Sequence, residues 1–539
     1  MTTRTWGCLS GIIAILAAAI GGAVFLLRPP LPPTAARPIS IDTGLVQGMN
    51  ENGLTIYRGI PFAAPPIGEL RWRAPEPPAP WTNVLKATAF KPACMQSGPT
   101  VPGVDVEKVS EDCLYLNVWT SAKSAEEKRA VMVYLYGGDF RNGSGSARLY
   151  WGDQLAKKGV VVVTFNYRVS AFGTLAHPEL SIESGLNASG NEMLLDSIAA
   201  LQWVKRNIAA FGGDASNVTI FGQSAGAYLV NDLMVSPLAD GLFDRAIGQS
   251  GGDMGMAGSY GDYPLLAQAE QTGVAFGNSL GANSLSALRD ISAVKIVAAD
   301  QENSATANKS DWPNVDGHVL PQDAYTLAAA GHGADIDLLV GIDADEGASE
   351  VDPRISPADY IAEIGAHYDE FADRFLALYP AHSNAEAAQS QAHLATADTA
   401  WRTFTWARLH AKAKNAKTFA FVFSRVPPFD PFLSLKAAGH GAELGYVFGY
   451  PPGSAFYFLE APWKAWRDAR IANEMQTYWT NFAKTGDPNG PGVPPWSAFT
   501  ATNDSALDIG GTDTTRALPD AKERALMDAY WAARRKQPH

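Results

Sequence analysis

The sequence predicts an α/β protein with a large, mostly parallel central sheet, helices on both faces and long insertions. Short apolar runs rich in β-branched and aromatic residues alternate with longer stretches of helical periodicity, and turn residues bound the runs. From about Ile39 onward, no linker, repeat or low-complexity stretch is long enough to mark a second domain. Because such sheets bind ligands at the carboxyl ends of their strands, we expect the functional residues there.

The individual elements follow from these patterns. The predicted strands are residues 130–136 (AVMVYLY), 160–166 (VVVVTFN), 218–221 (VTIF), 336–341 (IDLLVG) and 418–423 (TFAFVF). The helical spacing of apolar residues predicts helices over 198–211, 225–234 and 265–280. Strands that alternate with helices form a largely parallel sheet that is buried on both faces.

Composition excludes several classes of protein. Of the 539 residues, 46% are hydrophobic and 18% are charged, a balance too apolar for a disordered chain. The net charge is −13 and Lys and Arg form no cluster, so a nucleic-acid partner is not expected. No His, Asp or Glu group has the spacing of metal ligands, and the sequence therefore predicts neither a metal nor a cofactor.

The first 37 residues are predicted to export the remainder of the chain. Residues 6–27 carry no charge and, as a helix of about 33 Å, could cross a bilayer core of about 30 Å. A Pro-rich spacer, residues 29–33, follows. The segment is either a membrane anchor or a signal peptide cleaved near residues 17–19, and both readings place the chain in the periplasm or outside the cell. Residues 38–539 are expected to form a single domain.

The three cysteines are Cys8, Cys94 and Cys113. Cys8 lies in the export segment. Export would permit a Cys94–Cys113 disulfide, which would contribute on the order of 3 kcal/mol by restricting the unfolded chain. The alternative is two free buried thiols.

Three serines lie in the pattern G-x-S-x-G, namely Ser224, Ser250 and Ser279. A nucleophilic serine in this motif needs a strand before it and a helix after it, because the sharp turn between them exposes the hydroxyl. Only Ser224 has both. Ser250 precedes a glycine-rich stretch, and Ser279 ends a predicted helix. We therefore predict Ser224 as the nucleophile.

A nucleophilic serine requires a base and a carboxylate partner. His440 lies on a glycine-flanked loop and is the best base among the histidines after Ser224, which are His318, His332, His367, His382, His393, His410, His440 and His539. Asp343, Asp345 and Glu346 follow the predicted strand 336–341, and spacing alone does not rank these three carboxylates.

The chain resembles the type-B carboxylesterase/lipase family, which includes the cholinesterases and has the α/β-hydrolase fold. The matching strings are 59–63 (GIPFA), 111–118 (EDCLYLNV), 166–168 (NYR), 211–214 (FGGD), 221–227 (FGQSAGA), 345–347 (DEG), His440 with Glu443, and 478–489 (YWTNFAKTGDPN). They extend over nearly all of the chain after residue 38.

The resemblance implies a serine carboxylic-ester hydrolase that acts on small-molecule esters through an acyl-enzyme. It selects Glu346 as the acid, supports Ser224 and His440, and supports the Cys94–Cys113 bridge. It also implies an oxyanion hole formed by Gly138, Asp139 and Ala225. The hydroxyl of Ser250 is expected to lie near the acid.

Two departures from the family pattern bear on the substrate. Asp139 stands where the family usually has glycine or alanine, and Gln223 replaces the glutamate common before the nucleophile. Residues 95–112 contain no aromatic side chain that could hold a quaternary ammonium. These features favour uncharged or non-choline esters. The alternatives are a lipase or thioesterase variant of the same chemistry, or a non-catalytic binding or adhesion module.

Overall fold

The computed structural model describes residues 32–96, 108–257, 262–304, 312–349, 352–413, 415–427, 437–450, 462–500, 502–511, 514–517 and 521–536. The predicted membrane or signal segment, residues 6–27, and most of the interval between Cys94 and Cys113, residues 97–107, lie outside these ranges. Among the described residues, none of the helices combines the length and the hydropathy that a bilayer span requires.

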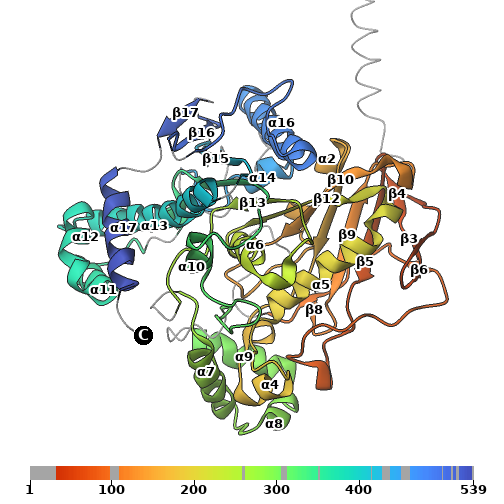
Figure 1. The fold of residues 1–539 in the computed structure, drawn as a ribbon, viewed down its shortest axis with the longest axis horizontal. Coiled ribbons are helices and arrows are strands. Elements are labelled where there is room, and N and C mark those ends of the chain that lie inside the picture. The colour runs from red at the N-terminus through yellow and green to blue at the C-terminus, as the bar shows by residue number, and fades with distance from the viewer. Residues whose placement is uncertain are drawn as a thin grey trace, which may run out of the picture.

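A 12-stranded sheet organises the described part of the chain (Figure 1). Its centre is parallel and has the order β11-β10-β12-β13-β14-β15-β16. These strands are β10 (Arg129–Leu135), β11 (Val161–Phe165), β12 (Gly213–Gln223), β13 (Arg245–Gln249), β14 (Asp337–Asp343), β15 (Thr418–Phe423) and β16 (Ser505–Ile509). Because consecutive side chains of β10 and β11 are all buried except at Arg129, both faces of the sheet centre are covered.

Antiparallel strands extend this sheet at both edges. One edge consists of β9 (Tyr115–Thr120), β5 (Leu54–Pro61), β4 (Met49–Glu51) and β1 (Thr34–Ala35), and the other is β17 (Thr515–Ala517). Two small sheets lie outside it and comprise β2 (Ile39–Ile41), β3 (Gly44–Gln47) and β6 (Leu85–Lys86), and β7 (Ala93–Cys94) with β8 (Val109–Ser110).

Helices connect the parallel strands and form the insertions. The α-helices are α2 (Asp153–Lys157), α3 (Ala171–Thr174), α4 (Pro178–Glu183), α5 (Glu192–Asn207), α6 (Ala225–Val235), α7 (Leu266–Ser279), α8 (Leu285–Arg289), α9 (Ala293–Ser304), α10 (Ala324–Ala329), α11 (Pro357–Tyr368), α12 (Ala372–Leu378), α13 (Asn384–Ala413), α14 (Leu444–Val447), α16 (Pro462–Thr485) and α17 (Ala521–Arg534). The 3-10 helices are η1 (Gly68–Leu70), η2 (Ala125–Glu127), η3 (Arg148–Tyr150), η4 (Ile208–Phe211), η5 (Pro237–Ala239), η6 (Glu346–Ser349) and η7 (Asp369–Phe371). In Figure 1, α11, α12 and α17 gather at one end, and α4, α7, α8 and α9 gather at another.

The mostly parallel sheet predicted from the sequence is confirmed, as are all five predicted strands and all three predicted helices. Among the strands, boundaries differ most at β12, which begins at Gly213 because its first residues pair with β10 across an irregularity, and the helix predicted from residue 198 begins earlier, at Glu192. The short strand β13 was not predicted, because its sequence RAIGQ contains a glycine and two polar residues. It is nevertheless the central strand between β12 and β14.

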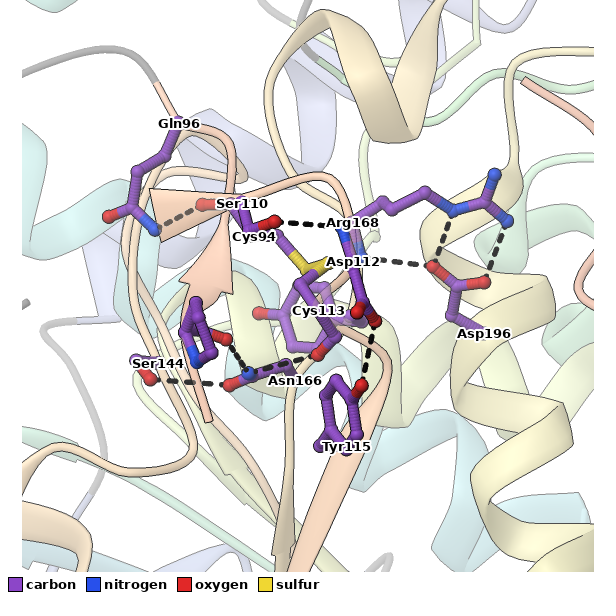
Figure 2. Close-up of a disulfide and its surroundings, with 12 residues drawn as sticks. Cys94, Gln96, Ser110, Asp112, Cys113, Tyr115, Ser144, Asn166, Arg168 and Asp196 are labelled. Atoms are coloured by element: carbon purple, nitrogen blue, oxygen red, sulfur yellow. Dashed lines mark hydrogen bonds and ion pairs between the residues drawn. A yellow bond between two sulfur atoms is a disulfide. The ribbon is translucent and has the colours of Figure 1, made fainter. Parts of the chain in front are cut away.

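Cys94 and Cys113 form a disulfide with Cα atoms 4.9 Å apart (Figure 2). Asn166, which follows β11, donates to the carbonyl of Cys113 at 3.1 Å and accepts from the N–H of Gly145 at 2.9 Å. The bridge is therefore tied to the segment that follows β10. Nearby, the buried Arg168 pairs with the fully buried Asp196 through two hydrogen bonds of 2.8 and 2.7 Å.

Candidate active site

Ser224 lies in the turn between β12 and α6. Its backbone has φ 56° and ψ −129°, a conformation that a residue with a side chain adopts only under constraint. The constraint comes from close packing, because a Cβ on Gly222 would lie 2.3 Å from the carbonyl oxygen of Gly226, and a Cβ on Gly226 would lie 2.1 Å from that of Leu135. The predicted strand, turn and helix around this serine are thus present.

The other two G-x-S-x-G serines have different surroundings. Ser279 is the last residue of α7, and its hydroxyl donates to the carbonyl of Phe276 at 2.7 Å, as a helix-terminal serine does. Ser250 follows β13 and has φ 55°, but residues 251–257, which come directly after it, form no helix. Its buried Oγ has no hydrogen-bond partner in the described structure.

His440 and Glu346 meet although 94 residues separate them in the chain. His440 Nδ1 lies 2.6 Å from Glu346 Oε2. An ionised carboxylate only accepts hydrogen bonds, so Nδ1 carries the proton and Nε2 of the neutral ring accepts. Gln223 Nε2 lies 3.1 Å from His440 Nε2 and donates to it. Glu346 is 2% exposed, whereas 30% of the His440 side chain is exposed.

The three carboxylates after the predicted strand 336–341 have separate contacts. Glu346 binds His440. Asp343 Oδ2 accepts from the N–H groups of Gly441 and Ala442 at 2.8 and 3.1 Å. Asp345 Oδ2 accepts from the N–H of Ala438 at 3.0 Å, and its own N–H donates to the carbonyl of Ala438 at 2.9 Å. Two of the three carboxylates therefore hold the loop that carries the histidine, and the third contacts the histidine itself.

Among the remaining histidines, His410 has a structural role that its two hydrogen bonds define. His410, on α13, is 5% exposed and bonds through both ring nitrogens, to Thr418 Oγ1 at 2.8 Å and to the carbonyl of Ile336 at 2.9 Å. It joins α13 to β14 and β15. His367 and His393 lie on α11 and α13, as the helical pattern around them predicted.

A cavity of about 310 Å³ brings these residues together. Its lining comprises Asp139, Phe140, Ser224, Ala225, Tyr228, Ser250, Trp312, Glu346, Gly347, Ala395, Asp398, Thr399, Arg402 and His440. One wall is aromatic, because Phe140 stacks edge-on against Trp312 and Tyr228 with ring centroids 5.7 and 6.1 Å apart. The charged and polar lining residues Asp398, Thr399 and Arg402 are contributed by α13. All but two of the predicted site residues outside the disulfide line this cavity. Gly138 and Gln223 are the exceptions.

The loop after β10 approaches Ser224 closely. Gly138, Asp139 and Phe140 all have positive φ, at 136°, 54° and 59°. A Cβ on the preceding Gly137 would lie 2.6 Å from the carbonyl oxygen of Gln223, so only glycine permits this approach. On the other side, Ala225 is the first residue of α6, and its N–H is among the amides that a helix leaves without an intrahelical acceptor.

Arg402 is the feature of the cavity that sequence reasoning missed. It pairs with Asp262 and with Asp398, each at 2.7 Å, and 9% of its side chain is exposed. Burial opposes its charge, but the two carboxylates outweigh burial and raise the pKa of Arg402 well above its usual value. The spacing of Asp398 and Arg402, four residues apart on a helix, was the available clue to their pairing, but it did not place them at the site.

Comparison with known proteins now identifies the class. A family model described as "Carboxylesterase family" matches residues 35–526 of this chain. The chain is 35% identical to the fumonisin B1 esterase of Sphingopyxis macrogoltabida over 476 residues, which cover 85% of this chain and 84% of that protein. It is also 35% identical to the para-nitrobenzyl esterase of Bacillus subtilis (strain 168) over 506 residues, which cover 91% and 98%.

A solved structure agrees with these relatives. A thermophilic PNB esterase superimposes with a TM-score of 0.80 at 31% identity, over 91% of this chain and 99% of that chain. The fold is therefore the α/β-hydrolase fold predicted from the sequence. The chain belongs to the carboxylesterase family, and it is a serine carboxylic-ester hydrolase.

Proposed function

We propose that ester hydrolysis takes place at Ser224, with His440 as the general base and Glu346 as the acid that orients it. The observation that carries this assignment is the single cavity lined by all three residues, in which the 2.6 Å bond from Nδ1 to Glu346 leaves Nε2 of His440 free of its own proton. Membership of the carboxylesterase family supports the same reaction.

In this mechanism Ser224 Oγ attacks the ester carbonyl carbon while His440 Nε2 takes the hydroxyl proton. Glu346 stabilises the imidazolium. The alcohol leaves with the proton from His440, and a water that His440 deprotonates then attacks the acyl-enzyme, releasing the acid and returning a proton to Ser224. Gln223 donates to the same Nε2 in the resting structure, so this hydrogen bond must be replaced by one from the serine hydroxyl before attack.

The oxyanion of the tetrahedral intermediate needs N–H donors. We assign these to Ala225 and to the loop residues Gly138 and Asp139. The position of Ala225 at the start of α6 and the close packing of the loop on Gln223 support the assignment. The Asp139 side chain is exposed and lines the cavity. A carboxylate there disfavours substrates that carry a negative charge near the reacting carbonyl.

For the substrate we propose uncharged, non-choline esters of small molecules. Gln223 contributes no negative charge beside the nucleophile, and residues 95–112 contain no aromatic side chain for a quaternary ammonium. The charged groups of α13 support polar substituents on such an ester, because Asp398 and Arg402 line the cavity, where Arg402 is shared between Asp398 and Asp262.

Labelling with a fluorophosphonate tests the nucleophile. The expected adduct lies on the peptide that contains Ser224, and Ser224→Ala abolishes it. Ser279→Ala is the matched control, because Ser279 occupies the same sequence motif but bonds within α7, and this variant should label as the unsubstituted protein does. An adduct on Ser250, or no adduct with an intact fold, would contradict the assignment and in the second case favour a binding module.

We also propose that the chain is exported to the periplasm or beyond the cell, with residues 6–27 as signal or anchor. The Cys94–Cys113 disulfide supports an oxidising compartment. Cell fractionation with N-terminal sequencing of the mature protein separates the two forms of export. Recovery of the full-length chain in the cytoplasm with both thiols free would contradict the proposal.

A further inference from the structure

Two buried carboxyl groups, those of Asp343 and Glu443, are not among the residues that line the cavity. Asp343 is the last residue of β14, and Glu443 immediately precedes α14. Their exposed fractions are 0% and 1%. Carboxyl groups at this depth need a physical reason to be retained, because an unpaired charge there is strongly destabilising.

Hydrogen bonds fix one oxygen of each carboxyl group as an acceptor. Trp479 Nε1, which can only donate, bonds Gln249 Oε1 at 3.1 Å and so fixes the orientation of that amide. Gln249 Nε2 therefore points to Glu443 and donates to Oε1 at 2.8 Å. On the other side, two backbone N–H groups donate to Asp343 Oδ2. Neither oxygen can carry a proton into the space between the two carboxyl groups.

Glu443 directly follows Gly441 and Ala442, whose amides bind Asp343, so the two carboxyl groups lie close together, and each one influences the pKa of the other. Their remaining oxygens, Asp343 Oδ1 and Glu443 Oε2, are buried and have no hydrogen-bond partner in the described structure. Two ionised carboxylates would leave both oxygens unsatisfied, whereas one proton held between the two groups satisfies both.

The energetics of the pair assign the proton to Asp343. Burial, and then the charges of Glu443 and Glu346, raise the pKa of Asp343 well above its usual value. Burial also raises the pKa of Glu443, but the hydrogen bond from Asp343 opposes that rise. The other titratable groups near Glu443 are the carboxylate of Glu346, whose charge also raises the pKa of Glu443, and the buried phenols of Tyr134 and Tyr150, from β10 and η3.

Asp343 connects the two partners of the proposed triad. Its backbone N–H donates to Glu346 Oε1 at 2.7 Å, and its side chain accepts from the two amides that directly follow His440. One residue thus fixes the position of the acid and of the base across the 2.6 Å bond between them.

We propose that Asp343 and Glu443 share a proton and that this pair is a positioning device that holds His440 against Glu346. The proposal rests on the proposed function, in which His440 is the base. Loss of the shared proton would place two negative charges in contact in a buried site and displace the loop at Gly441. Catalysis should therefore fail at alkaline pH because kcat falls, while KM changes little.

The pH dependence of kcat in variants of Asp343 tests this proposal. Asp343→Asn keeps an oxygen for the two backbone amides and an N–H for Glu443, but has no proton to lose. Asp343→Ala loses both contacts. We expect Asp343→Ala to lower kcat by roughly 10- to 100-fold, the effect of a misplaced catalytic group, with KM within about threefold. Asp343→Asn should recover most of that loss and extend activity to higher pH.

Asp345→Asn is the matched control, because this exposed carboxylate binds the same loop without a shared proton. It should keep the alkaline limb of the unsubstituted protein. The proposal is overturned if Asp343→Asn keeps that limb as well, or if it loses as much kcat as Asp343→Ala while its thermal midpoint is unchanged. Failure of the proposed function would be distinct, since it would show as missing Ser224 labelling in the unsubstituted protein.

Discussion

The serine side of the cavity is held by close backbone contacts, whereas the histidine side is held by buried carboxyl groups. Gly222 and Gly226 leave no space for a Cβ around Ser224, and these contacts do not depend on pH. The loop of His440 is instead bound by Asp343 and Asp345, which accept its backbone N–H groups. One half of the site should therefore respond to side-chain volume and the other half to protonation.

The largest expected effect is chemical and lies on the serine side. Ser224→Ala should lower kcat by about 10⁴-fold or more, as loss of a triad nucleophile does. The fold should be unchanged, because the serine hydroxyl is not required for any of the strand pairings around it. Steady-state kinetics with a chromogenic ester measure the loss, and residual activity within tenfold of the unsubstituted protein would place the nucleophile elsewhere.

The second-largest effect is expected from a substitution that adds side-chain volume next to Ser224. Gly226→Ala places a Cβ 2.1 Å from the carbonyl oxygen of Leu135, so we expect about 3 kcal/mol or more of lost stability together with lost activity. Gly365→Ala is the control, because that helical glycine has open space around it and should change stability by about 1 kcal/mol or less. Denaturant unfolding at two pH values measures the stability change in both variants. A stability loss in Gly226→Ala that depends on pH would contradict the contrast between the serine side and the histidine side.

Protonation on the histidine side should make the free energy of unfolding depend on pH. The folded protein holds a proton on Asp343 that the unfolded chain releases near pH 4, so this contribution is fully present below that pH and is lost as pH rises toward the raised pKa. The slope for one proton is about 1.4 kcal/mol per pH unit. Subtracting the pH dependence of Asp343→Asn from that of the unsubstituted protein leaves the contribution of Asp343 alone. Other buried carboxyl groups contribute equally to both proteins, including Asp253, whose pKa burial raises to about 7. Parallel curves for the two proteins would refute the shared proton.

The smallest expected effect concerns the substrate. Asp139→Gly removes an exposed carboxylate from the cavity lining and should change the relative kcat/KM values across an ester panel by roughly three- to tenfold, with anionic esters gaining most. The φ of 54° at this position suits glycine, so stability should not fall. Unchanged preferences across the panel would show that Asp139 takes no part in specificity.

How much of this could be predicted from the sequence depended on the range of the contacts. The turn at Ser224 is local, and residues 218–234 were sufficient to predict its strand and helix. The division of labour among Asp343, Asp345 and Glu346 is not local, because their side chains bind positions 93 to 99 residues away. The family pattern selected Glu346, but no spacing rule could show that Asp343 meets Glu443.

The α13 wall was missed for a different physical reason. This 30-residue helix buries residues around much of its circumference, so its apolar residues do not form the single stripe that periodicity detects. Asp398 and Arg402 lie on it as an ordinary helical ion pair. Their place in the cavity follows from the packing of α13 against β14 and η6, which only the folded chain reveals.

The rate of fluorophosphonate labelling, followed with peptide mapping, tests the central claim most directly, because it reports both the attacking residue and its activation. We expect the adduct on Ser224, and we expect His440→Gln to lower the labelling rate by at least about 100-fold, as loss of a general base does. An adduct on Ser250, or an equal rate in His440→Gln, would contradict it.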